Sequence, residues 1–289
     1  MNVLLLGYGY WGKKVFSTLN QFKDLNIFVY DTKINHVSLD DFLIKNSKFD
    51  CVFIVTPEET HYELVKKFLL LNKHVFVEKP LCLEKNQAQE LVDLAIKNKI
   101  ILFVDYIFLY DNFVKKIKKL LDSKILGKLQ KIESLRLSSS IVKPKIIVTD
   151  DLMIHDLYLI KYLFDGNNNQ LLIKSFKNED FKQLNFSMVL KNSLNIETFY
   201  SWIAEASQRK LTISGQKGAI IWEKDNSSET LMFDSNKKQT IVEVKNKYSP
   251  LYKSIKSFFG RTKKLNQRYN DYISDVDFLS KTKAVLYEN

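Results

Sequence analysis

Three glycines near the start of the chain, Gly7, Gly9 and Gly12, are spaced as G-x-G-x-x-G. They come directly after the apolar run Val3–Leu6, which predicts a buried strand, and before an amphipathic stretch, which predicts a helix. A glycine loop in this setting turns tightly, lets the backbone approach a pyrophosphate and aims a helix N-terminus at it. The spacing therefore predicts a dinucleotide-binding loop. Its expected contact residues are Gly7, Gly9, Tyr10, Trp11 and Gly12.

An acidic residue lies where such a loop needs one. Asp31 comes 19 positions after Gly12, at the end of the next predicted strand, Asn26–Tyr30. A carboxylate there can accept hydrogen bonds from the adenosine ribose hydroxyls and repels the 2′-phosphate of NADP. Lys33, two residues later, partly offsets that repulsion. The sequence therefore favours NAD as the cofactor, with NADP as the weaker alternative.

A second group of charged residues, Glu78 and Lys79, precedes Pro80 and follows the predicted strand His74–Val77. Ligands of open α/β sheets bind outside the carboxyl ends of the strands, which is where this group falls. A cation at that place can stabilise negative charge that develops on a reacting oxygen. A surface charge pair before a proline is the alternative interpretation.

A third group, Asp151 and His155, is four residues apart on a predicted helix, Asp151–Phe164, so both side chains share one face. A carboxylate beside an imidazole can set its tautomer and raise its basicity. Such a base can take the proton of a secondary alcohol while hydride leaves the same carbon. The alternative is a histidine that packs against solvent or core.

The order of predicted elements indicates two domains. Strand and helix alternate up to residue 107, which is typical of a doubly wound α/β sheet, and from residue 171 to 245 strands follow one another without intervening helices. We expect an α/β Rossmann domain over residues 1–107 and an α+β domain with a large, mostly antiparallel sheet over 108–289, with a C-terminal helix, about 269–286, able to pack back on the first domain. The expected strands of the second domain are Gln183–Leu190, Asn195–Ile203, Lys210–Ser214, Ala219–Glu223, Thr230–Asp234 and Thr240–Val244.

Composition limits the class of protein. Hydrophobic residues make up 45% and charged residues 27% of the 289, as in globular proteins. No apolar run reaches the roughly 18 residues that span a bilayer, and the N-terminal apolar run reads as a strand rather than a signal peptide. Cys51 and Cys82 lack metal-ligand spacing, so we expect no metal site and a reducing, cytoplasmic location.

The net charge of +11 is concentrated near the C-terminus. Residues 245–268 contain eight lysines and arginines and no acid. This basic segment has three possible interpretations. It can be a solvated face plus a linker, it can attract a phosphorylated or nucleotide-linked substrate, or it can bind nucleic acid or an anionic membrane. No recognition motif accompanies the charge, so we expect no specific nucleic-acid or membrane partner.

Taken together, these residues resemble the Gfo/Idh/MocA oxidoreductases, a family that includes inositol and nucleotide-sugar dehydrogenases. The resemblance covers nearly the whole chain, although it is thin after residue 225. The segments that carry it are Gly7–Lys13, Thr56-Pro57 with His61, His74–Leu81, Asp150–Asp156, Ser201-Trp202, Arg209 and Ile213–Gly218. One departure is Asp105-Tyr106, where the family usually has a small residue followed by His or Asn.

The resemblance implies roles for particular residues. Lys79 would bond the substrate oxygen in the nicotinamide site, His155 would be the acid/base and Asp151 would support it. Further residues implied at the cofactor are Thr56, Pro57, His61 and Glu78.

The function that follows is hydride transfer between NAD and a carbinol carbon of a sugar or nucleotide sugar, in a site between the two domains. Surface-polysaccharide synthesis is the expected context. The resemblance implies a homodimer or homotetramer, and a half-apolar sheet face would be covered by such assembly. A non-catalytic dinucleotide-binding sensor or assembly subunit is the alternative.

Overall fold

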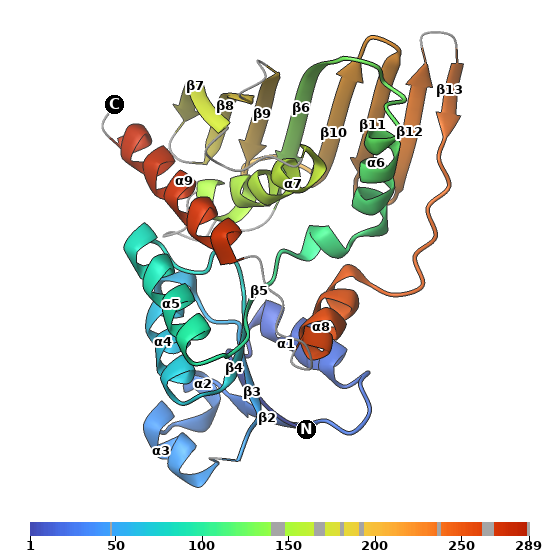
Figure 1. Ribbon diagram of the computed structural model, residues 1–289. Coiled ribbons are helices and arrows are strands. Elements are labelled where there is room, and N and C mark those ends of the chain that lie inside the picture. Colours follow the sequence, from blue (N-terminus) through green and yellow to red (C-terminus); the bar gives the residue numbers. More distant parts are fainter. Residues whose placement is uncertain are drawn as a thin grey trace. The chain divides into compact units, whose positions relative to one another are not determined.

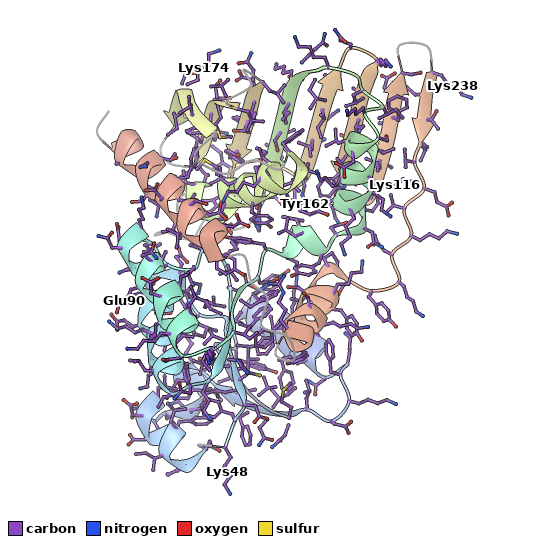
Figure 2. All side chains as sticks on the ribbon, in the orientation of Figure 1. Lys48, Glu90, Lys116, Tyr162, Lys174 and Lys238 are labelled. Atoms are coloured by element: carbon purple, nitrogen blue, oxygen red, sulfur yellow. The ribbon has the colours of Figure 1, made fainter. Side chains whose placement is uncertain are left out.

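The computed structural model describes residues 1–46, 48–139, 148–164, 171–179, 182–190, 194–235, 238–261 and 269–287. They form two compact units. The first contains Met1–Tyr110 and Tyr248–Ser280, and the second contains Asp111–Lys247 and the residues from Lys281 onward. Within the described residues, no helix is both long and apolar enough to cross a membrane. Lys48 in the loop before the third strand, Lys174 and Lys238 are exposed, so positive charge is not confined to the basic segment (Figure 2).

The first unit is built on a five-stranded parallel sheet. Its strands run in the order β2-β1-β3-β4-β5. The apolar runs of β1, β3, β4 and β5 are buried almost throughout, as in a sheet covered on both faces. This unit is therefore the α/β Rossmann domain that the sequence predicts. The strand bounds are β1 Asn2–Leu6, β2 Asn26–Tyr30, β3 Cys51–Ile54, β4 His74–Val77 and β5 Leu102–Val104.

Helices cover both faces of this sheet (Figure 1). One face carries α1 (Tyr10–Leu19) and α8 (Pro250–Arg261), and the other carries α4 (His61–Leu70) and α5 (Lys85–Lys97). The shorter helices of the unit are α2 Thr32–Asn35, α3 Leu39–Lys45, η1 Glu58–Thr60 and η2 Ile107–Tyr110.

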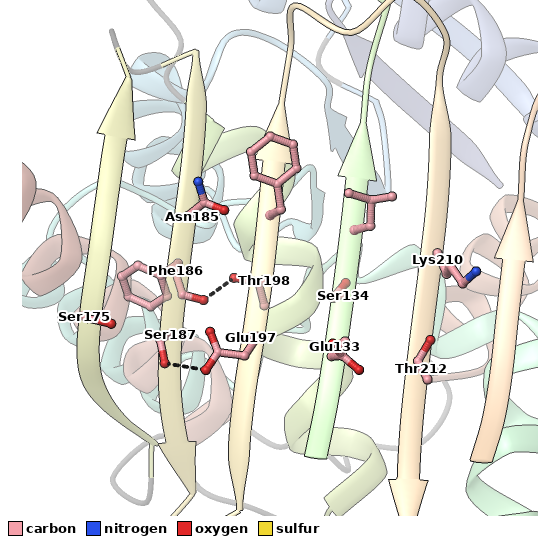
Figure 3. A pocket seen from close by; sticks show the side chains of 12 residues that line it. Glu133, Ser134, Ser175, Asn185, Phe186, Ser187, Glu197, Thr198, Lys210 and Thr212 are labelled. Atoms are coloured by element: carbon pink, nitrogen blue, oxygen red, sulfur yellow. Dashed lines mark hydrogen bonds between the residues drawn. The ribbon is translucent and has the colours of Figure 1, made fainter. Parts of the chain in front are cut away.

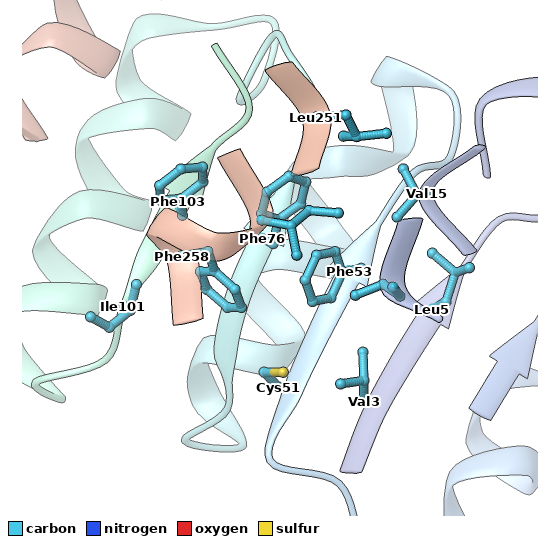
Figure 4. Packing of buried hydrophobic residues seen from close by; sticks show 12 residues of the cluster. Val3, Leu5, Val15, Cys51, Phe53, Phe76, Ile101, Phe103, Leu251 and Phe258 are labelled. Atoms are coloured by element: carbon cyan, nitrogen blue, oxygen red, sulfur yellow. The ribbon is translucent and has the colours of Figure 1, made fainter. Parts of the chain in front are cut away.

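Helix α8 corrects the simplest interpretation of the basic segment. Leu251, Ile255 and Phe258 are spaced as one helical face and belong to the core cluster that also contains Phe53 and Phe76 of the sheet (Figure 4). Residues 250–261 of the segment are thus not a linker. They form an amphipathic helix whose apolar face completes the Rossmann core and whose other face carries the exposed Lys256. Residues 262–268 lie outside the described part of the chain.

The packing of α8 against the sheet should contribute to the free energy of unfolding. Ile255 is fully buried, so we expect Ile255→Val to lower the free energy of unfolding by about 1 kcal/mol, the usual cost of one deleted core methyl group. Lys256→Ala, one residue further on the exposed face, should change it by less than about 0.5 kcal/mol. Urea unfolding of the full chain measures both. Equal, negligible effects would show that α8 is not part of the core.

The second unit contains an eight-stranded sheet in the order β13-β12-β11-β10-β6-β9-β8-β7. The pair β6–β9 is parallel and the other pairs are antiparallel, so the predicted mostly antiparallel sheet is confirmed. The final strand is earlier than the predicted Thr240–Val244. The bounds are β6 Leu129–Leu137, β7 Leu171–Glu179, β8 Gln183–Leu190, β9 Asn195–Ser201, β10 Gln208–Gly215, β11 Gly218–Lys224, β12 Glu229–Ser235 and β13 Lys238–Ile241.

Two helices, α6 (Asn112–Asp122) and α7 (Ile154–Phe164), cover one face of this sheet (Figure 1). Phe113 of α6 stacks on Trp222 of β11, and Asp156 of α7 binds Arg136 of β6. Helix α9 (Tyr269–Tyr287) contributes most of its length to the first unit, where the Tyr272 hydroxyl lies 3.4 Å from the Val104 amide of β5.

Candidate active site

The glycine loop connects β1 to α1, and its three glycines differ in how close a side chain would come to the surrounding backbone. Gly7 has φ +91°, and a Cβ there would lie 2.5 Å from the Val55 carbonyl oxygen. A Cβ on Gly12 would lie 2.2 Å from the Gly7 carbonyl oxygen. A Cβ on Gly9 would meet nothing within 4 Å. Gly7 and Gly12 therefore let the loop close on the strand and on itself, whereas Gly9 leaves open space above the backbone.

Among the described residues, no side chain caps the N-terminus of α1. Gly9 is its N-cap, and its first turn contains no acidic residue. The amides of the first turn therefore keep donor capacity and the positive end of the helix dipole. Together with the open space at Gly9, this arrangement fits the pyrophosphate of a dinucleotide. Tyr10 is 79% exposed, and the Lys14 ammonium lies 4.3 Å from the centre of its ring.

Asp31 follows β2 and is bound to the same loop. Its Oδ2 accepts the Tyr8 amide at 2.7 Å, and its Oδ1 accepts the Lys33 amide at 2.9 Å, which caps α2. These bonds lower the pKa of the Asp31 carboxyl below its ordinary value, with the Tyr8 amide contributing most. Each carboxylate oxygen retains a second acceptor site, so Asp31 is held ionised and can still accept hydroxyl groups.

The charge of Asp31 gives a specific expectation for cofactor choice. Asp31→Asn keeps one side-chain acceptor but removes the charge that opposes a 2′-phosphate. We expect the ratio of NADP to NAD affinity to rise about tenfold, which corresponds to 1.4 kcal/mol. Calorimetric titration with both dinucleotides measures this ratio. An unchanged ratio would mean that the Asp31 charge does not discriminate between them.

Glu78 lies directly after β4 and contacts the glycine loop. Its Oε1 accepts the indole N–H of Trp11, a residue 67 positions earlier, and its Oε2 lies 3.3 Å from the Lys79 amide. Burial raises the pKa of Glu78, although the Trp11 bond and the Lys79 charge oppose that effect. The structure therefore brings together Trp11 and Glu78, two of the predicted cofactor residues, and places Lys79 at the same edge of the sheet.

His61 joins the turns that follow β3 and β4. Its Nδ1 lies 2.7 Å from the Pro80 carbonyl oxygen and its Nε2 lies 3.0 Å from the Thr56 carbonyl oxygen. The ring is 1% exposed, and burial lowers its pKa. With both nitrogens directed at backbone, His61 braces the turns that contain Thr56-Pro57 and Lys79-Pro80.

The remaining predicted residues, Asp151 and His155, belong to the second unit. Asp151 lies in a π-helical turn, Thr149–Met153, that leads into α7, a feature often found at functional sites. His155 lies in the first turn of α7, and its Nδ1 is 2.7 Å from the hydroxyl of Tyr158. Tyr158, three residues along the helix, was not predicted, although i,i+3 spacing could have identified it.

A hollow of about 550 Å³ lies elsewhere in the second unit, on strands β6 to β10 (Figure 3). Ser134 and Arg136 of β6 bind Asp156 of α7, so the alternating residues Glu133 and Leu135 point to the opposite face. No helix of the described residues covers that face, which we call the helix-free face. The hollow lies on that face. None of the predicted site residues lines it, so it is a feature of the open sheet face rather than of the candidate active site.

Comparison with known proteins agrees with this architecture. Residues 1–106 match the model of the Gfo/Idh/MocA family, described as an oxidoreductase family with an NAD-binding Rossmann fold. An uncharacterised oxidoreductase of Streptococcus pneumoniae is 25% identical over 226 residues, which cover 71% of this chain and 60% of that protein. In this relative, in a 2,7-anhydro-N-acetylneuraminate hydratase of Escherichia coli and in an uncharacterised oxidoreductase of Synechocystis, the matched segment spans only 24% to 60% of the relative's own length.

Two solved structures share the fold over almost the whole chain. UDP-N-acetylglucosamine 3-dehydrogenase GnnA from Acidithiobacillus ferrooxidans has a TM-score of 0.79 at 20% identity, over 99% of this chain and 96% of that one. A 3-ketoreductase from Actinomadura kijaniata, solved with NADP and TDP-benzene, has a TM-score of 0.83 at 15% identity, over 98% and 97%. Over residues 1–106 this chain is therefore similar to the NAD-binding Rossmann fold of the Gfo/Idh/MocA oxidoreductases.

Proposed function

We propose that this protein is an NAD-dependent oxidoreductase that acts on a carbinol carbon of a sugar or nucleotide sugar. The observation that carries the proposal is the glycine loop: Gly9 leaves open space at an uncapped helix N-terminus, and Asp31 is held ionised beside Tyr8. The inositol dehydrogenases and nucleotide-sugar dehydrogenases among the relatives support the substrate class. Surface-polysaccharide synthesis remains the context that we propose.

The cofactor would be held by the carboxyl edge of the first sheet. The first-turn amides of α1 would bind the pyrophosphate and Asp31 the adenosine ribose, with Thr56, Pro57, His61 and Glu78 nearby. When bound, the nicotinamide supplies the hydride acceptor or donor. The proposal favours NAD over NADP because the Asp31 charge would oppose a 2′-phosphate.

Two side chains would handle the substrate hydroxyl. Lys79 would donate a hydrogen bond to its oxygen and stabilise negative charge there. His155 would accept the hydroxyl proton during oxidation and return it during reduction, with Asp151 supporting the imidazole. Oxidation thus moves one hydride to the cofactor and one proton to His155, which balances the conversion of alcohol to carbonyl.

Self-association is part of the proposal. The helix-free face of the second sheet carries half-buried apolar side chains such as Leu135 and Phe199 beside Glu133, Glu197 and Lys210. A second copy of this chain would cover such a face, giving a dimer or a tetramer. We place the enzyme in the cytoplasm, since Cys51 and Cys82 are both free and buried.

The test is an activity screen with purified full-length protein. NADH formation would be followed with a panel of free sugars, inositols and nucleotide sugars, and the reverse reaction with their keto forms. We expect turnover with at least one nucleotide sugar. Saturable NAD binding without turnover on the whole panel would favour the alternative, a dinucleotide-binding sensor or assembly subunit.

A further inference from the structure

Two carboxyl groups of the first unit lie at neighbouring strand ends. Glu78 follows β4 and Asp105 follows β5, where Val77 pairs with Val104 and the Asp105 amide donates to the Val77 carbonyl at 2.9 Å. Residues at paired positions of adjacent parallel strands point to the same side of a sheet. The two acids are therefore side by side, and Asp105 is 1% exposed.

Hydrogen bonds extend from this pair in two directions. Glu78 accepts the Trp11 indole N–H, which ties it to the glycine loop. Asp105 accepts the Ser254 hydroxyl through Oδ1, which ties it to α8. Asp105 Oδ2 is buried and has no hydrogen-bond partner among the described residues. The series Trp11, Glu78, Asp105 and Ser254 thus joins the cofactor loop to α8 along the sheet edge.

A buried carboxyl and a partly buried one beside it cannot both stay ionised at low cost. Burial and the neighbouring Glu78 charge raise the pKa of Asp105 well above its ordinary value. A charged oxygen that is buried without a hydrogen-bond partner is costly, and a proton on Asp105 Oδ2 removes that cost by neutralising the carboxyl group. Among the described residues, the titratable or charged side chains next to the pair include Lys79 on the turn after β4, Tyr110 in η2 and Tyr272 in α9. Beyond them, His61 of α4 lies near Lys79, and Arg261 of α8 lies near Tyr110.

We propose that Glu78 and Asp105 hold one proton between them, carried by Asp105, and that this carboxyl pair positions Trp11 and Lys79 for the dinucleotide. The positioning half rests on the proposed function, whereas the shared proton does not. Asp105 touches neither cofactor nor substrate in this proposal. It acts through Glu78, with Ser254 as its anchor on α8.

The shared proton is tested without cofactor. Above the ordinary pKa of Asp, the folded chain would bind one more proton than the unfolded chain, so stability falls as pH rises until the pair loses that proton. Asp105→Asn removes this titration, and the unfolding equilibrium constant of wild type should rise relative to that of the variant by up to about tenfold per pH unit. Asp93→Asn, an exposed site on α5, is the charge-matched control. Parallel pH profiles for wild type and Asp105→Asn would overturn the shared proton.

The positioning role is tested by NAD binding at neutral pH. Asn can still accept from Ser254 and donate toward Glu78, so Asp105→Asn should stay within about threefold of wild-type affinity. Asp105→Leu, which can do neither, should weaken binding about tenfold or more. Equal losses in both variants, or none in Asp105→Leu, would overturn positioning.

A second variant tests the pair from the side of Glu78. Glu78→Gln keeps an acceptor for Trp11 but removes the neighbouring charge, so burial alone would then raise the pKa of Asp105. The pH range over which stability falls should therefore end at a lower pH than in wild type, and an unchanged range would contradict the pair. If Asp105→Leu does not fold, a loss of NAD affinity beyond threefold in Asp105→Asn would overturn positioning. If wild type binds no dinucleotide, the proposed function fails, and the unfolding profiles still decide the shared proton.

Discussion

Lys79→Ala is expected to lower kcat about 100- to 1,000-fold, the loss typical of removing one group that stabilises charge on a reacting oxygen. Lys79 is the second residue after β4, next to Glu78 and at the same sheet edge as the glycine loop. The proposed interaction strengthens as negative charge develops on the substrate oxygen, so it acts mainly in the transition state. Stability should change little, because the Lys79 side chain is only partly buried.

The measurement is steady-state kinetics on the substrate found in the screen, with NAD affinity determined separately. Lys97→Ala removes an exposed lysine at the end of α5 and serves as the matched control, with kcat within about twofold of wild type. Full turnover by Lys79→Ala would remove Lys79 from the mechanism.

Gly9→Ala is expected to weaken dinucleotide binding about 100-fold or more, equivalent to roughly 2.7 kcal/mol, while the chain folds normally. A Cβ at Gly9 meets no protein atom within 4 Å, so the variant has no steric reason to unfold. The same methyl group would occupy the space through which the backbone approaches the pyrophosphate. The loss should therefore fall on binding and not on stability.

Gly260→Ala provides the control for this substitution. A Cβ at Gly260 of α8 also meets nothing within 4 Å, and alanine is the better helix former there. This variant should bind dinucleotide as wild type does. Wild-type affinity in Gly9→Ala would mean that the loop is an ordinary turn between a strand and a helix.

The Rossmann half of the fold was predictable because its signals are local. Strands such as β3 and β4 are short apolar runs buried on both faces, and the glycine spacing directly precedes a helix. A Cβ at Gly7 or Gly12 would lie closer to backbone atoms than any side chain tolerates, so glycine at these two positions indicates the turn. Asp31 was predicted for the same reason, since it ends the strand next to β1.

The rest depends on contacts between residues that are distant in the sequence. Leu251, Ile255 and Phe258 have helical spacing, but the many lysines and arginines around them favoured an exposed segment. The sequence therefore did not predict α8 or its packing in the core of the first unit. The bond between Trp11 and Glu78 spans 67 residues, and that between Ser254 and Asp105 spans 149. No local pattern encodes such pairs, because they form only when parallel strands and helices assemble on one sheet.

Every step of the proposed function requires that the loop of Gly7, Gly9 and Gly12 binds a nicotinamide dinucleotide. Isothermal titration of the full-length protein with NAD tests it most directly, with NADP as the comparison. The predicted result is saturable binding at one site per chain, tighter for NAD than for NADP and lost in Gly9→Ala. A folded wild-type chain that binds neither dinucleotide at millimolar concentration would contradict the claim.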